Sequence, residues 1–429
     1  MAVAASPNVS DINLTDLETF VERTPHDWFK RLRDDAPCYW QDEANGRGFW
    51  SVTRYDDILT LQKQPLLFSA GVGGTSLDDL TPEQVESRMS LLDMDPPRHS
   101  RLRALVNRGF TPKAVKVYED RIRTLIREIL VKTMPLGAFD FVEHISVELP
   151  MQILSDIMGS PLEDRHTLVS LGDRLLGNTE PDFVGDLVKD QSDLSQYAHL
   201  PFSSPAALEM FDYALGLADL KRNNPGEDVV TILINSELDG DTLSDHEFKL
   251  FFLLLITAGN ETTRHSMSHG IAALLQNRDE IARLCADPTL AGTAAEEIIR
   301  YATSVHHFRR TATEDVELHG QQIKAGDKVV LWFTSANRDE RMFPDPNRFD
   351  ISRTPNKHMA FGLGGPHYCL GSHLARLEIK VWLEELVPYL PDLYLNGPVD
   401  RMRSNFFNGI KRIPVRYEGF TTIDPLPNA

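Results

Sequence analysis

One cysteine stands at a position whose neighbours suit metal chemistry. Cys369 ends a glycine-rich loop that begins at Phe361 and reads FGLGGPHYC, and an amphipathic helical pattern follows at once. A thiol at a helix N-terminus lies among unpaired backbone N–H groups, which favour the thiolate. The three glycines leave room for a flat ligand close to the backbone. These features predict an anionic sulfur ligand for a metal.

The same loop is also compatible with less specific roles. A lone cysteine is often a small buried hydrophobic residue, and a glycine-rich turn before a helix can hold phosphate. No Gly-Lys-Ser/Thr triplet follows the loop, which argues against a phosphate loop. The other cysteines, Cys38 and Cys285, are isolated in the sequence, which argues against zinc. A buried thiol and a metal thiolate therefore remain as alternatives, and other segments must decide between them.

The cysteine loop resembles the haem-binding loop of the cytochrome P450 monooxygenases, in which one cysteine thiolate is the proximal iron ligand. In the usual family pattern an aromatic residue lies seven places before the cysteine. Here Phe361 lies eight places before Cys369, and Gly362 takes the seventh place. This insertion resembles an actinobacterial branch that hydroxylates sterols and branched lipids. The resemblance implies haem b as the cofactor, Cys369 as its ligand, and Phe361 and Gly362 as cofactor contacts.

A second polar segment interrupts an apolar helical pattern. Residues 256–263 read ITAGNETT, and such residues are poor choices for the middle of a buried helix. They predict a locally opened helix at a functional site, with a polar kink satisfied by backbone carbonyls as the alternative. The block resembles the oxygen-binding part of the distal helix of the family, which implies cofactor contacts at Ala258 and Gly259. It also implies that Thr262 hydrogen-bonds the reacting dioxygen and that Glu261 belongs to the proton relay.

Glutamate and arginine residues form a candidate buried network. Glu297 and Arg300 are three residues apart on one helical face, and a weak surface pair is the simplest interpretation. The following segment FPDPNRFD completes the resemblance to a buried triad of the family, formed by Glu297, Arg300 and Arg348. A buried guanidinium needs a carboxylate partner. The triad would hold the loop that presents Cys369.

Basic residues elsewhere are candidates for binding the carboxylates of a cofactor. His99 and Arg103 are four residues apart on one helical face, for which a solvated surface is the alternative. Haem carries two propionates that must be neutralised when they are buried. The resemblance implies propionate contacts from His99, Arg103, Arg310 and His367.

The charge of the chain limits its partners. With 44 Lys plus Arg and 63 Asp plus Glu the net charge is −19, which argues against nucleic-acid binding and general attraction to anionic membranes. Basic residues nevertheless dominate positions 98–127. In the family the matching helices dock a small 2Fe–2S ferredoxin, whereas a solvated basic helix is the alternative. The resemblance implies a docking face with Arg108, Lys113, Arg376 and Lys380.

Helical periodicity dominates the chain, and short strand patterns are scattered through it. Helical patterns cover 115–134, 247–276 and 294–301, and strand-like runs cover 48–52, 316–318, 328–332 and 411–417. These patterns predict a mainly α fold with small β-sheets. No repeat or linker divides the chain, so we predict one domain over 1–429, with 1–27 as a loosely ordered N-terminal extension. The resemblance implies a triangular-prism P450 domain, with the haem between the distal helix and the helix after Cys369.

The cysteines and the N-terminus bear on the cellular location. Three scattered cysteines fit a reducing compartment. The first ten residues lack a basic region and a long apolar stretch, and the longest apolar run, 250–258, is too short to cross a bilayer. We therefore predict a cytoplasmic protein without a signal peptide or membrane anchor, as in the soluble bacterial members of the family.

Two breaker-rich stretches, 69–90 and 177–205, match segments that cover the substrate pocket in the family. Apolar side chains in these and other matching segments are implied to line the pocket: Phe68, Phe183, Phe202, Val305, Phe308, Phe406 and Phe407. They suggest a large apolar substrate, with a steroid or terpenoid favoured and a fatty acid or another small apolar compound as the alternative. His306 and His307 have two interpretations, which are bonding a polar end of the substrate and facing solvent.

The resemblance implies a reaction as well as a fold. It predicts hydroxylation with O2 and two electrons from NAD(P)H, delivered through a ferredoxin reductase and a ferredoxin. A thiolate ligand donates electron density to iron and favours O–O cleavage. A non-catalytic haem sensor or lipid-binding protein is the alternative of another class, and it would need neither a proton relay nor a docking face.

Overall fold

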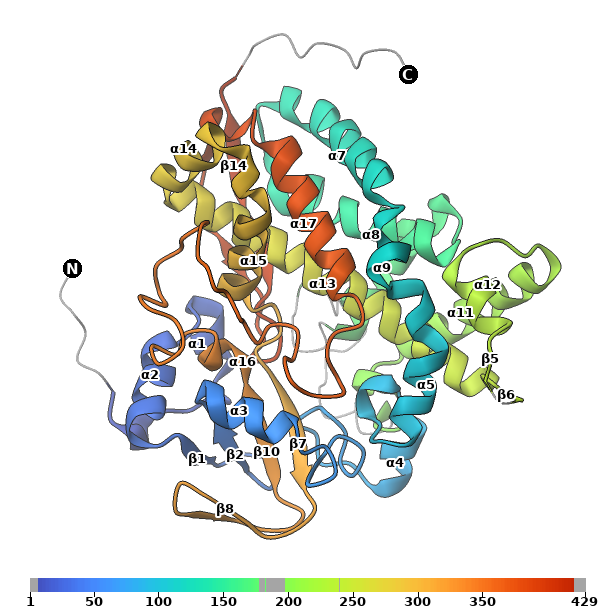
Figure 1. The fold of residues 1–429 in the computed structure, drawn as a ribbon, viewed down its shortest axis with the longest axis vertical. Helices are drawn as coiled ribbons and strands as arrows, with labels where there is room; N and C mark the ends of the chain where they lie inside the picture. Colours follow the sequence, from blue (N-terminus) through green and yellow to red (C-terminus); the bar gives the residue numbers. More distant parts are fainter. Residues whose placement is uncertain (1–6, 177–181, 183–196, 239, 420–429) are drawn as a thin grey trace.

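The computed structural model describes residues 7–176, 182, 197–238 and 240–419, and it is mostly helical (Figure 1). The helices on the N-terminal side of the longest one are α1 Leu17–Glu22, α2 His26–Asp35, α3 Tyr55–Gln62, α4 Pro82–Ser87, α5 Arg98–Val106, α6 Pro112–Lys116, α7 Glu119–Thr133, α8 Glu148–Met158, α9 Arg165–Leu176, α11 Ala206–Asn223 and α12 Val229–Ile234. The others are α13 Asp245–Gln276, α14 Arg278–Ala286, α15 Ala291–Ala302, α16 Phe333–Ala336 and α17 Ser372–Leu386. The predicted mainly α class is confirmed.

The strands are short and form several small sheets. They are β1 Cys38–Gln41, β2 Phe49–Val52, β3 Phe68–Ser69, β4 Ala138–Asp140, β5 Glu237–Leu238, β6 Asp241–Thr242, β7 His307–Ala312, β8 Val316–Leu318, β9 Gln321–Ile323, β10 Lys328–Trp332, β11 Leu393–Leu395, β12 Asp400–Arg401, β13 Ile410–Arg412 and β14 Pro414–Tyr417. The largest sheet has the order β1-β2-β10-β7-β3. In this sheet β10 pairs parallel with β2 and antiparallel with β7.

Helix α13 is the longest element and passes through the middle of the helical region (Figure 1). It begins with a capping box, in which the Ser244 hydroxyl accepts from the Glu247 N–H and the Glu247 carboxylate accepts from the Ser244 N–H. Most of its side chains are buried because α8, α9, α11, α15 and α17 all contact it. A helix buried on several sides needs no polar stripe, which explains its long apolar sequence.

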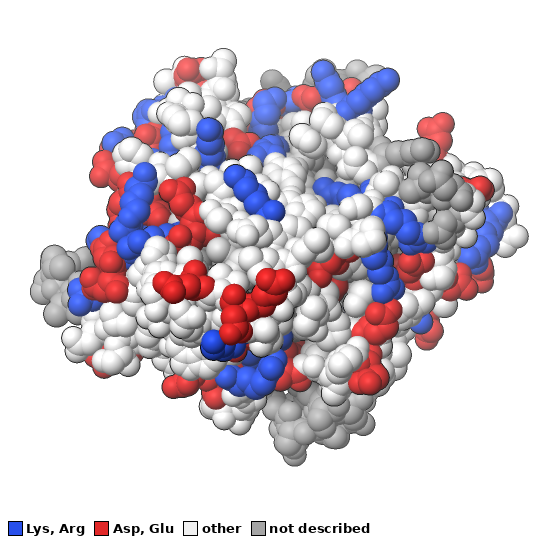
Figure 2. Space-filling model, turned by 60° about the horizontal axis from the view of Figure 1, so that its bottom comes forward, with Lys and Arg blue, Asp and Glu red and all other residues white. Residues whose placement is uncertain are grey.

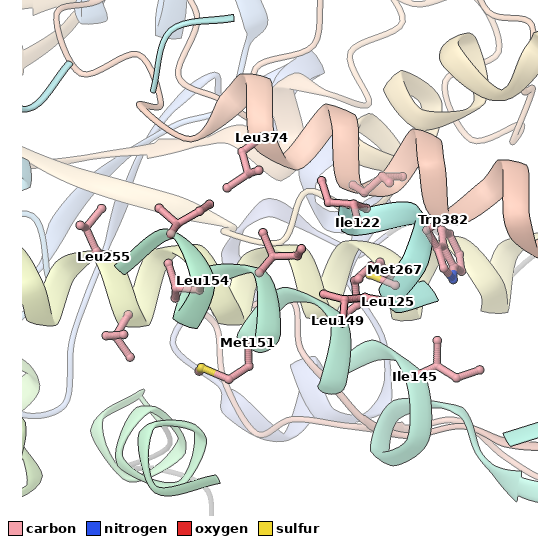
Figure 3. Close-up of a cluster of buried hydrophobic side chains, with 14 of the residues drawn as sticks. Ile122, Leu125, Ile145, Leu149, Met151, Leu154, Leu255, Met267, Leu374 and Trp382 are labelled. Carbon is pink, nitrogen blue, oxygen red and sulfur yellow. The ribbon is translucent and has the colours of Figure 1, made fainter. Parts of the chain in front are cut away.

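Aliphatic side chains of α7, α8 and α17 meet those of α13 (Figure 3). Leu149 and Leu154 come from α8, Met267 from α13, Leu374 from α17 and Leu125 from α7. Burial of each such side chain contributes roughly 1.5–3 kcal/mol. This core fixes the position of α17, and therefore of the cysteine loop before it, relative to α13.

The N-terminal residues are more ordered than predicted. Ile12, Leu14 and Phe20 are buried and pack with Phe49 and Trp332 of the largest sheet. The interpretation of 1–27 as a loosely ordered extension is therefore wrong for residues 7–27. The sequence signal was the set of apolar residues in this segment, of which Ile12, Leu14 and Phe20 pack against residues of the sheet.

Most predicted elements match the structure, with two breaks, one of which divides the strand-like run of 411–417 between β13 and β14 at Ile413. The helical pattern of 115–134 is divided between α6 and α7, which are separated by two residues. The patterns of 247–276 and 294–301 correspond to α13 and α15. Within the described residues, no helix has the length and apolar character that a membrane crossing requires.

Candidate active site

Cys369 lies between the glycine-rich loop and α17. Its N–H donates to the Phe361 carbonyl at 2.9 Å, and α17 begins three residues later at Ser372. Desolvation raises the pKa of the Cys369 thiol, while the Gly371 N–H and the Arg103 guanidinium act in the opposite direction. The helix N-terminus therefore favours the thiolate as expected, although burial opposes it more strongly. A bound cation would supply the missing stabilisation of the thiolate.

The glycines of the loop have two different roles. A Cβ on Gly365 would lie 2.7 Å from the Gln62 carbonyl oxygen, and one on Gly364 would lie 2.5 Å from Leu59 Cδ1. These two glycines therefore allow the loop to pack on α3, not a ligand to approach the backbone. Gly362 borders the cavity described below, and its φ of +70° explains why glycine occupies the inserted position.

Phe361 is held by aromatic and cationic neighbours. The Arg376 guanidinium lies 4.6 Å from the centre of its ring, and the Tyr368 ring lies edge-on at 6.4 Å. Arg376 also binds the Glu296 carboxylate, with Nε 2.5 Å from Oε1. The inserted residue therefore leaves Phe361 beside the cysteine loop and bordering the cavity.

A cavity of about 720 Å³ lies between α13 and the cysteine loop. Ala258, Gly259 and Thr262 of α13 border it, as do Phe361 and Cys369 of the loop. Neither of the other two cysteines is among the described residues that line it. The cavity thus places the thiol and the polar segment of α13 around one space.

Thr262 keeps its hydroxyl at the cavity although its helix is regular. The hydroxyl donates to the Ala258 carbonyl at 2.8 Å, and the Thr262 carbonyl accepts from Ser266 and Ser304 hydroxyls at 2.8 and 2.9 Å. The structure assigns α-helix throughout this segment, so the expected local opening of the helix is wrong. The bonded hydroxyl still has lone pairs that can accept a proton or a hydrogen bond.

The surroundings of Glu261 differ from those of the adjacent Thr262. Its carboxylate contacts Arg264 and accepts from the Asn260 amide at 3.0 Å, and it is not among the residues that border the cavity. Arg264 Nη1 is 2.9 Å from an Asp173 carboxylate oxygen on α9. Burial raises the pKa of Glu261, and Arg264 acts against that shift. The sequence reasoning missed Arg264 and Asp173, because the pairing of α9 with α13 has no local signal.

Four predicted basic side chains border one part of the cavity: His99, Arg103, Arg310 and His367. The His99 and His367 rings lie 4.4 Å apart. Neither nitrogen of His99 nor Nε2 of His367 has a hydrogen-bond partner in the described chain, and none of the four side chains is paired there with a carboxylate. Burial lowers the pKa of His367 to about 2, which makes it a neutral donor. Partnerless donors and two guanidinium groups fit the two carboxylates of a haem.

The buried triad differs from the prediction in one residue. Arg300 binds the Glu297 carboxylate through two bonds of 2.8 Å, and both side chains are fully buried. The second guanidinium on Glu297 belongs to Arg353, with Nε at 3.1 and 3.2 Å. Arg348 is exposed and contributes its backbone carbonyl to Arg300 and Arg353. The assignment of Arg348 to the triad is therefore wrong, because the turn at 345–350 directs its side chain outward.

The triad is connected to the cysteine loop through backbone contacts. Arg300 Nη1 donates to the Asn337 carbonyl at 2.7 Å. The Asn337 side chain accepts from the Met359 N–H at 2.6 Å, and the Met359 carbonyl accepts from Gly362. Glu296, the residue before Glu297 on α15, binds His358 at 3.0 Å and also binds Arg376. Helix α15 therefore anchors both ends of the loop.

Most predicted pocket residues border the cavity: Phe202, Val305, Phe308, Phe406 and Phe407. Phe68 is an exception, because it is buried in β3 among core residues and does not border the cavity. Phe183 lies outside the described residues. His307 borders the cavity, and both His306 and His307 are buried, so the solvent-facing interpretation is wrong for both.

Many residues of the predicted basic face are ion-paired. Arg101, Arg121, Arg123 and Arg127 contact Glu247, Asp156, Glu384 and Glu385 at 2.5–2.9 Å. Lys380 pairs with Glu384 at 3.0 Å, and Arg376 pairs with Glu296. Basic and acidic side chains are likewise intermixed on the face in Figure 2. Lys113 is exposed, and the Arg108 side chain lies outside the described residues.

Comparisons with known proteins agree with this geometry. A family model described as Cytochrome P450 matches residues 289–390. A steroid C26-monooxygenase of Mycolicibacterium smegmatis is 38% identical over 425 residues, which cover 96% of each protein. The chain belongs to the cytochrome P450 family. A methyl-branched lipid omega-hydroxylase of Mycobacterium tuberculosis is also 38% identical to this P450, over 91% of this chain and 90% of that protein.

A solved structure extends the likeness to the whole fold. The Mycobacterium marinum cytochrome P450 CYP268A2, in complex with pseudoionone, has a TM-score of 0.85 and 36% identity, and the match covers 97% of this chain and all of that one. The predicted P450 fold, the haem cofactor with a cysteine thiolate ligand, and the monooxygenase class are confirmed. The resemblance to an actinobacterial branch that acts on steroids and branched lipids is confirmed by the named relatives.

Proposed function

We propose that this P450 hydroxylates a steroid or a similar large apolar molecule at a carbon held between α13 and the cysteine loop. The observation that carries the proposal is the shared cavity, which Cys369 and Thr262 both border. Phe308, Phe406 and Leu254 add apolar walls to this space. The names of the relatives, one of which acts on steroids, support the substrate class.

Cys369 is the proposed proximal ligand, and the four basic side chains of the cavity are the proposed propionate contacts. When bound, the thiolate-ligated haem supplies the activation of dioxygen and the cleavage of the O–O bond. His99 and His367 would donate hydrogen bonds, while Arg103 and Arg310 would neutralise charge. Ala258, Gly259, Phe361 and Gly362 would contact the faces of the group, which their position on the cavity wall supports.

Thr262 and Glu261 are the proposed proton-handling pair. Thr262 Oγ1 would accept a hydrogen bond from a water at the cavity, because its own hydrogen is directed to the Ala258 carbonyl. Burial raises the pKa of Glu261, so its carboxyl group takes up a proton more readily than an exposed glutamate does. The apolar walls would exclude bulk water, so that protons enter by this route.

We also propose that a small ferredoxin with an NAD(P)H-dependent reductase supplies the electrons. Lys113 and Lys116 lie close in sequence on α6, which contacts α17, and both are exposed without an ion-pair partner in the described chain. Lysine charges on this side would attract an acidic partner and accelerate its association. We also propose a cytoplasmic location, which the three unpaired cysteines support. A single domain over the whole chain is proposed as well, and the continuous core across α7, α13 and α17 supports it.

Turnover with defined electron donors tests the proposal. Purified P450 would be incubated with ferredoxin, ferredoxin reductase, NAD(P)H and one of cholest-4-en-3-one, a terpene or a methyl-branched fatty acid. We expect a hydroxylated steroid and a red-shifted Soret band in the reduced, carbon-monoxide-treated protein. Cys369→Ala should lose that band. A normal band without oxidation of any of these compounds would contradict the proposed activity, and oxidation of the fatty acid alone would favour a lipid hydroxylase.

A further inference from the structure

The cavity reaches from Cys369 to the N-terminal segment, where its wall changes composition. Thr15, Leu17, Leu77, His307 and Asn405 line this part, which we name the distal arm. The Asn405 amide donates to the Leu14 carbonyl at 3.0 Å, which joins two sides of the wall. The distal arm therefore has a built wall that combines the apolar side chains of Leu17 and Leu77 with the polar side chains of Thr15, His307 and Asn405.

Buried cations of the sheet fix the loop that contributes Leu77 to the distal arm. Arg309 Nη1 donates to the Asp78 carbonyl at 2.6 Å, and Lys328 Nζ donates to the Leu77 carbonyl at 3.0 Å. Lys328 also contacts the Glu43 carboxylate. Arg309 and Lys328 are already bonded to groups of the protein, so their charges are not available to a ligand.

His307 is the polar group of the distal arm that has no partner. It stands opposite Trp332 in the β7–β10 register, with ring centroids 4.6 Å apart, and Phe406 packs edge-on at 5.4 Å. The residue is 1% exposed, and neither ring nitrogen has a hydrogen-bond partner in the described part of the chain. A buried donor or acceptor without a partner is unfavourable, and the place of His307 on the cavity wall allows an oxygen of a ligand to satisfy it.

The charge state of His307 restricts the ligand. Burial lowers its pKa to about 3, so the imidazole is neutral and offers one N–H donor and one acceptor. A neutral imidazole suits a hydroxyl or carbonyl oxygen better than a carboxylate, which needs a cation. Arg88, another cation on the cavity wall, is already bonded to Asp78 and to the Ala198 carbonyl.

We propose that His307 hydrogen-bonds a neutral oxygen of the substrate, a ketone or an alcohol, at the end remote from the carbon that is hydroxylated. This inference rests on the proposed function and narrows its substrate class to oxygenated steroids or terpenoids, with carboxylates disfavoured. His306 provides a contrast on the same segment. Its nitrogens also lack partners in the described chain, but it packs against Phe20 and does not border the cavity.

A matched pair of steroids tests the hydrogen bond directly. Cholest-4-en-3-one carries a ketone oxygen on carbon 3 that cholest-4-ene lacks. Binding of each steroid to the holoenzyme can be followed by the Soret shift and by equilibrium dialysis. We expect the wild-type protein to bind the ketone about five- to tenfold more tightly, the ratio of a typical single hydrogen bond. His307→Phe keeps the ring contacts with Trp332 and Phe406 and should abolish this preference. His307→Gln should retain part of it, and His306→Phe all of it.

One result that would overturn the inference can be measured on the wild-type protein alone, so it does not depend on the folding of a variant. Equal affinity of the wild-type protein for the two steroids would contradict it, as would an unchanged preference in His307→Phe with a normal Soret band. Hydroxylation of the ketone together with equal affinities would remove this inference and leave the proposed function intact. If neither steroid binds and neither is hydroxylated, the proposed substrate class fails as well.

Discussion

The Glu261 carboxylate contacts the Arg264 guanidinium one turn further along α13, and both side chains are almost completely buried. The Asp173 carboxylate on α9 contacts a different nitrogen, Nη1, of the same guanidinium. Glu261 therefore belongs to an ion-pair cluster, whereas the adjacent Thr262 belongs to the cavity wall. A proton on Glu261 needs a change of rotamer or a bridging water to reach the Thr262 hydroxyl.

Replacing Thr262 by alanine should uncouple electron consumption from hydroxylation. The hydroxyl at the cavity is lost, while the cavity walls and the cysteine loop are unchanged, so the red-shifted carbon-monoxide band should persist. We expect several-fold less product per NAD(P)H and more hydrogen peroxide. Thr262→Ser keeps the hydroxyl and should stay coupled. Equal coupling in Thr262→Ala and the wild-type protein would refute the proposed role.

Glu261→Gln should slow turnover by roughly 10- to 100-fold, because an amide cannot deliver a proton. The measurement is the steady-state rate at saturating ferredoxin, together with the solvent isotope effect. Asp173→Asn is the matched control on the same guanidinium and should change the rate far less. A rate that survives in Glu261→Gln would show that another group supplies the protons.

Arg353 and Arg348 should differ sharply in their importance. Arg353 binds the fully buried Glu297, and loss of one partner from a buried ion pair typically costs about 3–5 kcal/mol. We expect Arg353→Ala to lower the free energy of unfolding by an amount approaching this range and to reduce haem content. Arg348→Ala should change it by less than about 0.5 kcal/mol. Urea unfolding of both variants measures the two changes in the free energy of unfolding. A larger change for Arg348→Ala would support the triad predicted from the sequence.

Stability should fall as the pH is lowered from about 6.5. Burial lowers the pKa of His269 and His307 to about 3, from an ordinary value of 6.5, and it lowers the pKa of His265 and His306 as well. The unfolded chain therefore takes up protons first, and the stabilisation is complete above pH 6.5 and is lost toward pH 3. His269 and His307 each contribute a slope of about 1.4 kcal/mol per pH unit in this window, and His265 and His306 act in the same direction.

Urea midpoints between pH 7 and pH 5 measure this slope. His306→Phe removes one buried imidazole that does not border the cavity and should make the dependence less steep. An unchanged slope in that variant would mean that His306 titrates at its ordinary pKa in the folded protein.

Lys113→Ala combined with Lys116→Ala should weaken ferredoxin-supported turnover at low ionic strength. Their charges are uncompensated in the described chain, so their loss should lower the association rate a few-fold and reduce its dependence on salt. Lys380→Ala removes a lysine that is paired with Glu384 and should have a smaller effect. Identical salt dependence in the double variant and the wild-type protein would place the docking site elsewhere.

The sequence was informative where the chemistry is local. The FGLGGPHYC loop and the ITAGNETT segment identify Cys369, Thr262 and Gly362 without any knowledge of packing. Helix α13 could be located because its apolar helical pattern is long. Local motifs, together with the family resemblance that they carry, were therefore sufficient for most of the cavity wall.

Contacts between distant segments could not be predicted in the same way. Arg353 and Arg348 are five residues apart, and only the path of the 345–350 turn decides which guanidinium reaches Glu297. Asp173 becomes a partner of Arg264 because α9 packs on α13. The thiol pKa of Cys369 also depended on burial, which helix position alone did not reveal.

The anchoring of the 75–80 loop by Arg309 and Lys328 has a consequence for how substrate choice can change. Both cations hold backbone carbonyls, so these two contacts do not depend on the side chains at positions 77 and 78. Replacing Leu77 or Leu80 would reshape the space offered to a substrate while its frame stays in place. Selectivity can thus evolve, or be engineered, one side chain at a time on a rigid support.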